Sequence, residues 1–84
     1  MRVFRRPIPT VSTSIPDIIG SAISQVSGVG LQAAEANAQT IYFGDKSEQP
    51  FELRPKANAM LPVNSIKDVH LKGTSGDFIF IGLF

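Results

Sequence analysis

The residues that could carry out chemistry are few and scattered. His70 is the single histidine of the 84-residue chain, cysteine is absent, and the seven acidic residues are spread along the sequence. His70 stands in a Val-His-Leu alternation, which predicts a solvent-facing position on a strand rather than a catalytic base. None of these residues has the spacing of a zinc site, a calcium loop or a nucleophile elbow. The sequence therefore predicts no catalytic residue, no metal site and no enzymatic activity.

Two glycines need a separate explanation. Gly28, Gly30 and Ala33 match the pattern G-x-G-x-x-A, in which glycines let a dinucleotide pyrophosphate approach the N-terminus of a helix. That motif requires a buried strand immediately before it, and residues 24–27 (Ser-Gln-Val-Ser) are a poor strand. We therefore predict no cofactor site and interpret the glycines as a flexible link between the N-terminal region and the rest of the chain.

A small basic cluster lies at the beginning of the chain. Arg2, Arg5 and Arg6 occur with no acid among the first six residues, and the remainder has five basic against seven acidic residues. The planar fork of a guanidinium group suits both carboxylates and phosphates, but three charges without a basic stripe form a weak nucleic-acid footprint. We favour an acidic protein surface over simple solvation and over nucleic acid. With their apolar neighbours Phe4 and Ile8, the arginines are the predicted partner-binding residues.

The first 16 residues are predicted to form an extended arm. Pro7, Pro9 and Pro16 each fix their own φ and bias the preceding residue toward extended backbone. The alternative is a disordered terminus. The same prolines interrupt any apolar stretch after the arginines, so we expect no secretory signal peptide.

A short amphipathic helix is expected after the arm. The apolar residues from Ile15 to Val26 follow the spacing of one helical face, and Ser14 with Asp17 resembles a capping box. These residues are Ile15, Ile18, Ile19, Ala22, Ile23 and Val26. Residues 1–28 are thus predicted to be the arm and helix, and residues 29–84 the body.

The body shows the pattern of an all-β domain. Short apolar segments alternate with turn residues about every 8 to 12 positions, as in a small antiparallel β-sandwich. The segments are Thr40–Phe43, Phe51–Leu53, Ala59–Val63 and Val69–Leu71. Residues 31–39 are ambiguous, because alanine and glutamate favour a helix. We expect a strand over Val29–Ala33 followed by a turn at residues 35–37.

The C-terminal segment is apolar on both faces. Val69–Lys72, a loop over Gly73–Asp77 and a last strand read as a hairpin. The last strand carries Phe78, Phe80 and Phe84 on one face and Ile79, Ile81 and Leu83 on the other. These six residues are our predicted self-association surface, since a doubly apolar strand needs burial on both sides. The alternative is a central strand of a monomeric sandwich. The run is too short for a membrane-spanning helix, which needs about 20 residues.

Size also favours assembly. A domain of this length buries only about 60–65% of its unfolded surface, and without cysteine it cannot be stabilised by disulfides. A charged fraction of 18% with 43% apolar residues nevertheless argues against a disordered chain. We expect a homo-oligomer and take a trimer as a working copy number, which the sequence itself does not determine.

More than half of the chain follows a recognisable order of segments. Asn37–Asp45 contains an Ile-Tyr-Phe-Gly-Asp strand and turn, Phe51–Pro55 has the form Phe-x-Leu-x-Pro, and Ile66–Leu71 and Gly73–Phe84 close the chain. This order resembles small virion structural proteins of tailed bacteriophages, such as decoration, head-fibre and tail-associated β-modules. The resemblance implies a virion location, and a β-sandwich whose N-terminal segment attaches to a larger capsid, portal or tail protein. It supplies no active-site residues.

A second function is compatible with the same fold. Loops on a rigid β-scaffold commonly carry recognition, and the chain has two prominent loops, Gly44–Pro50 and Gly73–Asp77. The alternative prediction is therefore a binding module that recognises a receptor, a glycan or nucleic acid through these loops.

Overall fold

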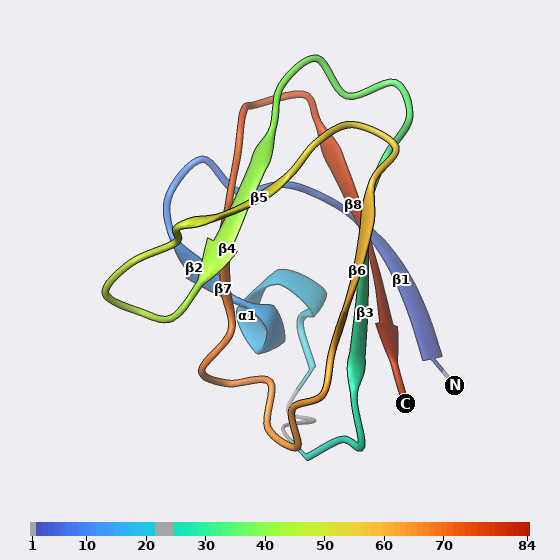
Figure 1. Cartoon of the computed structure of the whole chain (residues 1–84), viewed down its shortest axis with the longest axis vertical. Helices are drawn as coiled ribbons and strands as arrows, with labels where there is room; N and C mark the ends of the chain where they lie inside the picture. The colour runs from blue at the N-terminus through green and yellow to red at the C-terminus, as the bar shows by residue number, and fades with distance from the viewer. Residues whose placement is uncertain (1, 22–24) are drawn as a thin grey trace.

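The chain folds into two antiparallel four-stranded sheets packed face to face (Figure 1), as seen in a computed structural model that describes residues 2–21 and 25–84. Sheet A has the strand order β1-β8-β3-β6, and sheet B has the order β2-β7-β4-β5. The strands of sheet A are β1 (Arg2–Pro7), β8 (Phe78–Leu83), β3 (Val29–Ala33) and β6 (Asn58–Leu61). Those of sheet B are β2 (Thr13–Ser14), β7 (His70–Lys72), β4 (Ile41–Gly44) and β5 (Phe51–Leu53). The predicted small all-β sandwich is confirmed.

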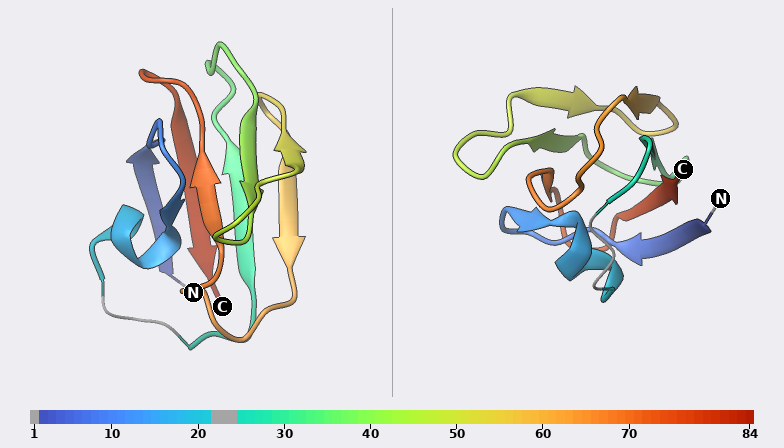
Figure 2. Two further views of the ribbon diagram at one scale, coloured as in Figure 1. Left: turned by 90° about the vertical axis from the view of Figure 1, so that its left-hand side faces the viewer. Right: turned by 90° about the horizontal axis from the view of Figure 1, so that it is seen from below.

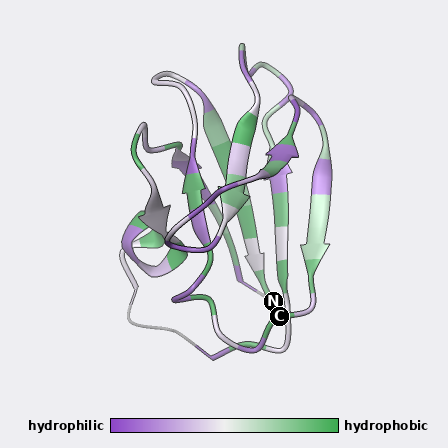
Figure 3. Cartoon of the chain, turned by 60° about the vertical axis from the view of Figure 1, so that its left-hand side comes forward, coloured by the Kyte–Doolittle hydropathy of each residue, from purple (hydrophilic) through white to green (hydrophobic). Residues whose placement is uncertain are grey.

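Alternating side chains form one core between the sheets. Buried and accessible residues alternate along β3, β4 and β8. Figure 3 shows hydrophobic and more hydrophilic bands along several strands, whereas β8 is apolar on both faces. The core consists of Ile8, Ile15, Ile19, Val29, Leu31, Ala33, Ile41, Phe43, Leu53, Ile66, Val69, Leu71, Ile79, Ile81 and Leu83. Because a strand has a side-chain period of two, each sheet keeps one face for the core and one for solvent or a partner.

The predicted arm is extended, but it is part of the sandwich. Arg2–Pro7 forms β1, which pairs with the whole of β8 from Arg2 opposite Leu83 to Pro7 opposite Phe78. Ile8 follows β1 directly and lies in the shared core. The division at residue 28 therefore does not correspond to a break in the core, since residues before and after it pack together. Pairing along the whole of β8 holds the segment against sheet A instead of leaving it to project.

One short helix is present, as predicted. α1 (Ile15–Ile19) buries Ile15 and Ile19 and ends at Gly20, which adopts the left-handed conformation with φ 67°. Ser14 occupies the N-cap position and Asp17 the first turn, but the side chain of Ser14 makes no capping hydrogen bond. The glycine at C′ terminates the helix early. Of the predicted helical face, Ala22 and Ile23 lie outside the described residues, and Val26 follows the helix in an irregular segment.

Most connections between consecutive strands cross from one sheet to the other. β4 and β5 form a hairpin within sheet B, whereas the chain changes sheets in every other connection between consecutive strands. Figure 2 shows these crossings between the two layers. The predicted hairpin at Gly73–Asp77 is therefore wrong: β7 pairs with β2 and β4, and β8 pairs with β1 and β3.

The ambiguous segment after Gly28 is resolved in favour of a strand. β3 spans Val29–Ala33 and a turn follows at residues 35–36, as expected. β3 lies between β8 and β6, so both of its backbone edges are paired. Pairing on both sides and burial of Leu31 and Ala33 override the helical preference of the neighbouring alanines.

Candidate interaction surface

The last strand directs its two apolar faces to different environments. Ile79, Ile81 and Leu83 point into the sandwich and are buried in its own core. Phe78 and Phe80 are half-buried on the outer face of sheet A, and Phe84 just beyond the strand is 48% exposed. The prediction that all six residues mediate self-association is thus wrong for the three inward-facing ones, because the second sheet already covers them. Only the phenylalanine face remains available to a partner.

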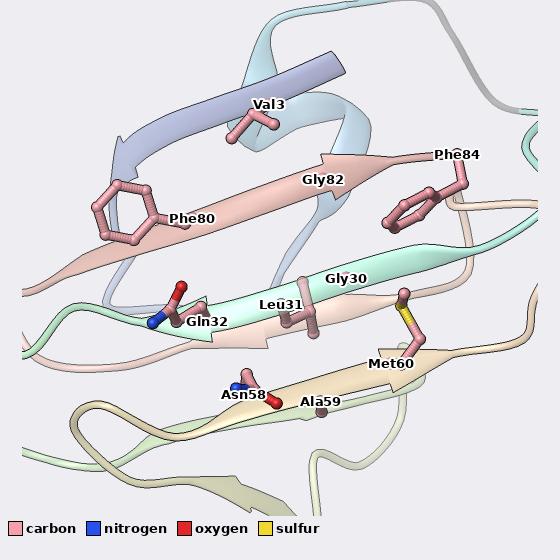
Figure 4. Close-up of a pocket in the computed structure, with 10 residues that line it drawn as sticks. All are labelled: Val3, Gly30, Leu31, Gln32, Asn58, Ala59, Met60, Phe80, Gly82 and Phe84. Carbon is pink, nitrogen blue, oxygen red and sulfur yellow. The ribbon is translucent and has the colours of Figure 1, made fainter. Parts of the chain in front are cut away.

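The outer face of sheet A carries a shallow apolar groove. Gly30 of β3 and Gly82 of β8 stand opposite each other in register, and their lack of side chains leaves a hollow of about 320 Å³. Figure 4 shows the two glycines between Phe80 and Phe84, with Val3 and Met60 on either side. A glycine within a strand is unfavourable for the strand itself and often marks close approach of another group.

The side chains around this groove are unusually exposed for apolar residues. Val3 is 60% and Met60 63% exposed, and Phe84 adds a third accessible apolar side chain. The aromatic ring of Phe84 and the sulfur of Met60 both lie beside Gly30, at 3.4 and 3.5 Å from where a Cβ would stand. We call the set Val3, Gly30, Met60, Phe80, Gly82 and Phe84 the glycine groove. Sequence reasoning identified its phenylalanines, but not Val3 and Met60, which come from the two edge strands.

The predicted partner-binding arm is only partly accessible. Arg2 and Arg5 are exposed, Phe4 and Arg6 are half-buried, and Ile8 is 4% exposed. Ile8 is therefore not a partner contact. It follows the end of β1, and its side chain is buried in the core. The other four residues lie on the free edge strand of sheet A, where a partner can still reach them.

The three arginines contact aromatic rings of their own sheet. The guanidinium carbon of Arg5 lies 3.9 Å from the centre of the Phe78 ring, and those of Arg2 and Arg6 each lie 5.2 Å from the centre of the Phe4 ring. Arg6 also donates to the carbonyl of Ile19 at 3.5 Å, at the C-terminal end of α1. Among the residues that the structure describes, the ion pair found joins Lys56 to Glu35, and none joins an arginine. The arm arginines thus keep their charge uncompensated by a neighbouring carboxylate.

Asn37 and Asp77 form a polar cluster, here called the clasp, at the end of the sandwich opposite the termini. The clasp joins the link between β3 and β4 to the link between β7 and β8. Asn37 donates through Nδ2 to the carbonyl of Phe78 and accepts from the Phe78 amide through Oδ1, both at 2.8 Å. Asp77 accepts from the amides of Ala38 and Gln39 at 2.9 and 3.1 Å. Asn37 and Asp77 are 8% and 4% exposed. The sequence showed that Asn37 and Asp77 favour turns, but not that their side chains bond two segments that are distant in the chain.

The two loops of the alternative binding function do not combine into one site. Gly44 at the end of β4 stands opposite His70 at the start of β7, so the loop after β4 and the loop after β7 lie at opposite ends of sheet B. Asp77 is moreover committed to the clasp. His70 is half-buried on the outer side of sheet B, and its Nδ1 has no hydrogen-bond partner in the described part of the chain.

Residues 2–21 and 25–84 contain no cluster of three or more histidine, cysteine or acidic side chains that could hold a metal ion. No helix within these ranges is long and apolar enough to cross a membrane. Comparison with known proteins gave no family model, no curated protein and no solved structure that matches the chain.

Proposed function

We propose that this protein is a non-enzymatic structural component of a phage particle, which acts by assembling with copies of itself and with a larger capsid, portal or tail protein. The observation that carries the proposal is the glycine groove on the outer face of sheet A. A sheet face directed to water is normally polar, whereas this one exposes Val3, Met60 and Phe84 around two glycines. The order of segments that resembles virion proteins agrees with a role in assembly.

The exposed apolar area sets the scale of the contact. A large side chain offers about 150 to 250 Å² when fully exposed, so the three exposed residues present on the order of 300 Å². Covering that area contributes about 7 kcal/mol at ~25 cal/mol per Å². Association itself costs about 4 to 15 kcal/mol. The face of one copy therefore supports a weak contact, and lasting attachment requires several copies or additional contacts.

The edge strand β1 supplies such additional contacts. Arg2 and Arg5 are exposed on the strand that also carries Val3, so a cationic edge borders the apolar face. An acidic rim on the partner would satisfy both guanidinium groups. The attachment that the sequence assigned to a projecting arm is thus proposed for the folded edge of sheet A.

The first test is the presence of the protein in particles. We expect mass spectrometry of particles purified from a producing culture to detect the chain in a fixed ratio to the major capsid protein. Absence from purified particles, with the chain present in the same lysate, would refute the virion role.

The second test addresses the surface. Removing residues 1–16 would delete β1 and the core residues Ile8 and Ile15, so a point substitution is the better probe. We expect Val3→Lys to reduce incorporation into particles at least tenfold, because it places a charge beside the groove. Val11→Lys is the matched control, since Val11 is 70% exposed but lies outside sheet A. Equal incorporation of the two variants would show that the groove is not the contact surface.

A further inference from the structure

The four edge strands of the sandwich differ in how they are protected against pairing with another chain. An open edge is usually made short, charged or interrupted by proline. β1 carries three arginines and ends at Pro7, β2 has two residues, and β5 has three residues with Glu52 in its middle. β6 has the sequence Asn-Ala-Met-Leu, four residues long, with neither charge nor proline. Figure 2 shows β6 and β1 at opposite edges of sheet A.

We propose that β6 pairs antiparallel with β6 of a second copy across a two-fold axis, which joins two copies of sheet A into one eight-stranded sheet. This inference deepens the self-association in the proposed function and rests on it. It specifies a dimer in place of the trimer that was taken above as a working copy number.

The charges of the two edges identify a second copy as the occupant. Antiparallel pairing of β6 with itself brings no like charges together, whereas pairing of β1 with itself would place arginines across from arginines. Pairing of β6 with β1 of another copy would leave one open edge at each end and grow without closing. A β6 pair closes the assembly, because both ends of the joined sheet are then the arginine-bearing β1.

The position of the axis follows from which side chains share a face. Opposite residues of an antiparallel pair point to the same face. If the pairing is confined to β6, Ala59, which packs on the core, therefore stands opposite Ala59 or Leu61 of the copy. Met60 must likewise stand opposite Met60 or Asn58. The axis therefore passes through a residue, either Ala59 or Met60, and not between them.

The backbone selects between these two registers. The amide of Ala33 donates to the carbonyl of Ala57 at 3.0 Å, so the Ala57 carbonyl faces β3, and so do the N–H and C=O groups of Ala59 and Leu61. Those of Asn58 and Met60 face the open edge. An axis at Ala59 places Asn58 opposite Met60 twice, which gives four inter-chain hydrogen bonds. An axis at Met60 would place Asn58 opposite Pro62, which has no N–H. We therefore assign the axis to Ala59.

This register can be tested by disulfide formation, since the chain has no cysteine of its own. At the axis, the two copies of Ala59 form a non-hydrogen-bonded pair with Cα atoms about 4.5 Å apart, within the range of a disulfide. We expect Ala59→Cys to form covalent dimers on mild oxidation. Asn58→Cys and Met60→Cys should each fail alone, because each lies one residue from the axis and its two copies are offset by two residues along the paired strands, about 7 to 8 Å apart. The two variants should cross-link when mixed.

A proline substitution tests the pairing without a cross-link. Met60→Pro removes an N–H that faces the open edge and no hydrogen bond to β3, so the monomer should keep its fold. We expect wild-type protein to be a dimer by light scattering at about 100 μM and Met60→Pro to be a monomer with an unchanged circular dichroism spectrum. Val11→Pro is the control: Val11 lies in the exposed link after β1, so this variant should remain dimeric.

Several results would overturn the assignment. A monomeric wild type, a dimeric Met60→Pro, or cross-linking of Met60→Cys alone with none at Ala59 each contradicts the proposed register or the pairing itself. Cross-linking of Ala59→Cys to a different protein in the particle, with no homodimer, would show that the edge binds another partner. The dimer is measured with purified protein, so its failure is distinguishable from absence of the chain from particles, which refutes only the virion role.

Discussion

A substitution of Asn37 tests whether the clasp stabilises the fold where the chain crosses between the sheets before β4 and before β8. Asn37→Ala removes two hydrogen bonds of 2.8 Å to the backbone of Phe78 at a position that is 8% exposed. Each such bond contributes about 0.5 to 1.5 kcal/mol net, and an unpaired group left behind costs about 1 to 3 kcal/mol. Because water can reach part of this site after truncation, we expect the free energy of unfolding to fall by about 2 to 3 kcal/mol.

The assay is urea and thermal unfolding followed by circular dichroism. In a domain of this size 1 kcal/mol corresponds to roughly 4 to 8 °C in the melting temperature, so a decrease of about 10 to 20 °C is expected. Asn64→Ala is the control, because Asn64 is an exposed asparagine and should change stability by less than about 0.5 kcal/mol. An Asn37→Ala variant as stable as this control would refute the clasp as a source of stability.

Three further substitutions test local features of the backbone and the clasp. Asp77→Ala removes the acceptor for two amides and should lower the free energy of unfolding by about 2 kcal/mol in urea titration; an unchanged midpoint would contradict this role. Lys56, which follows Pro55, has a φ of 73°. Lys56→Gly should raise the free energy of unfolding by about 0.5 kcal/mol, because the backbone strain that glycine relieves exceeds the entropy that it adds to the unfolded chain. A lower urea midpoint for this variant would contradict the prediction. At Gly44 a methyl group would collide with the backbone carbonyl of Glu48, so Gly44→Ala should cost about 1 to 3 kcal/mol by thermal melting, and a wild-type melting temperature would show that the turn relaxes freely.

The strand positions were predictable because they depend on local pattern. Val29–Ala33 and Phe51–Leu53 were predicted with the observed bounds, since apolar alternation and turn residues act over a few positions. The early end of α1 at Gly20 was also readable in principle from the glycine. Sequence patterning thus identified which segments are strands in most of the body.

The pairing of those strands was not predictable in the same way. Val69–Lys72 and Phe78–Phe84 look like a hairpin, but Asn37, from a distant part of the chain, bonds the backbone of Phe78 at the start of β8, and the two strands enter different sheets. β1 likewise finds its partner at the other end of the chain. Such choices depend on long-range packing that no local pattern encodes, and the same applies to Val3 and Met60, which meet at the groove only through sheet A.

The central position of β8 determines how each part of sheet A can associate: β8 through its side chains alone, and an edge strand through its backbone. β8 lies between β1 and β3, so its backbone is paired on both sides, and only its outward phenylalanines can contact a partner. New backbone pairing must therefore use an edge, and β6 is the unprotected one. In the proposed β6 dimer, outward residues stay on one face across the axis, so both glycine grooves would point the same way. When the two grooves of one rigid dimer bind the same particle, the first contact raises the effective concentration for the second. Two weak contacts could in this way keep a small β-sandwich with a modest apolar face attached to a large particle.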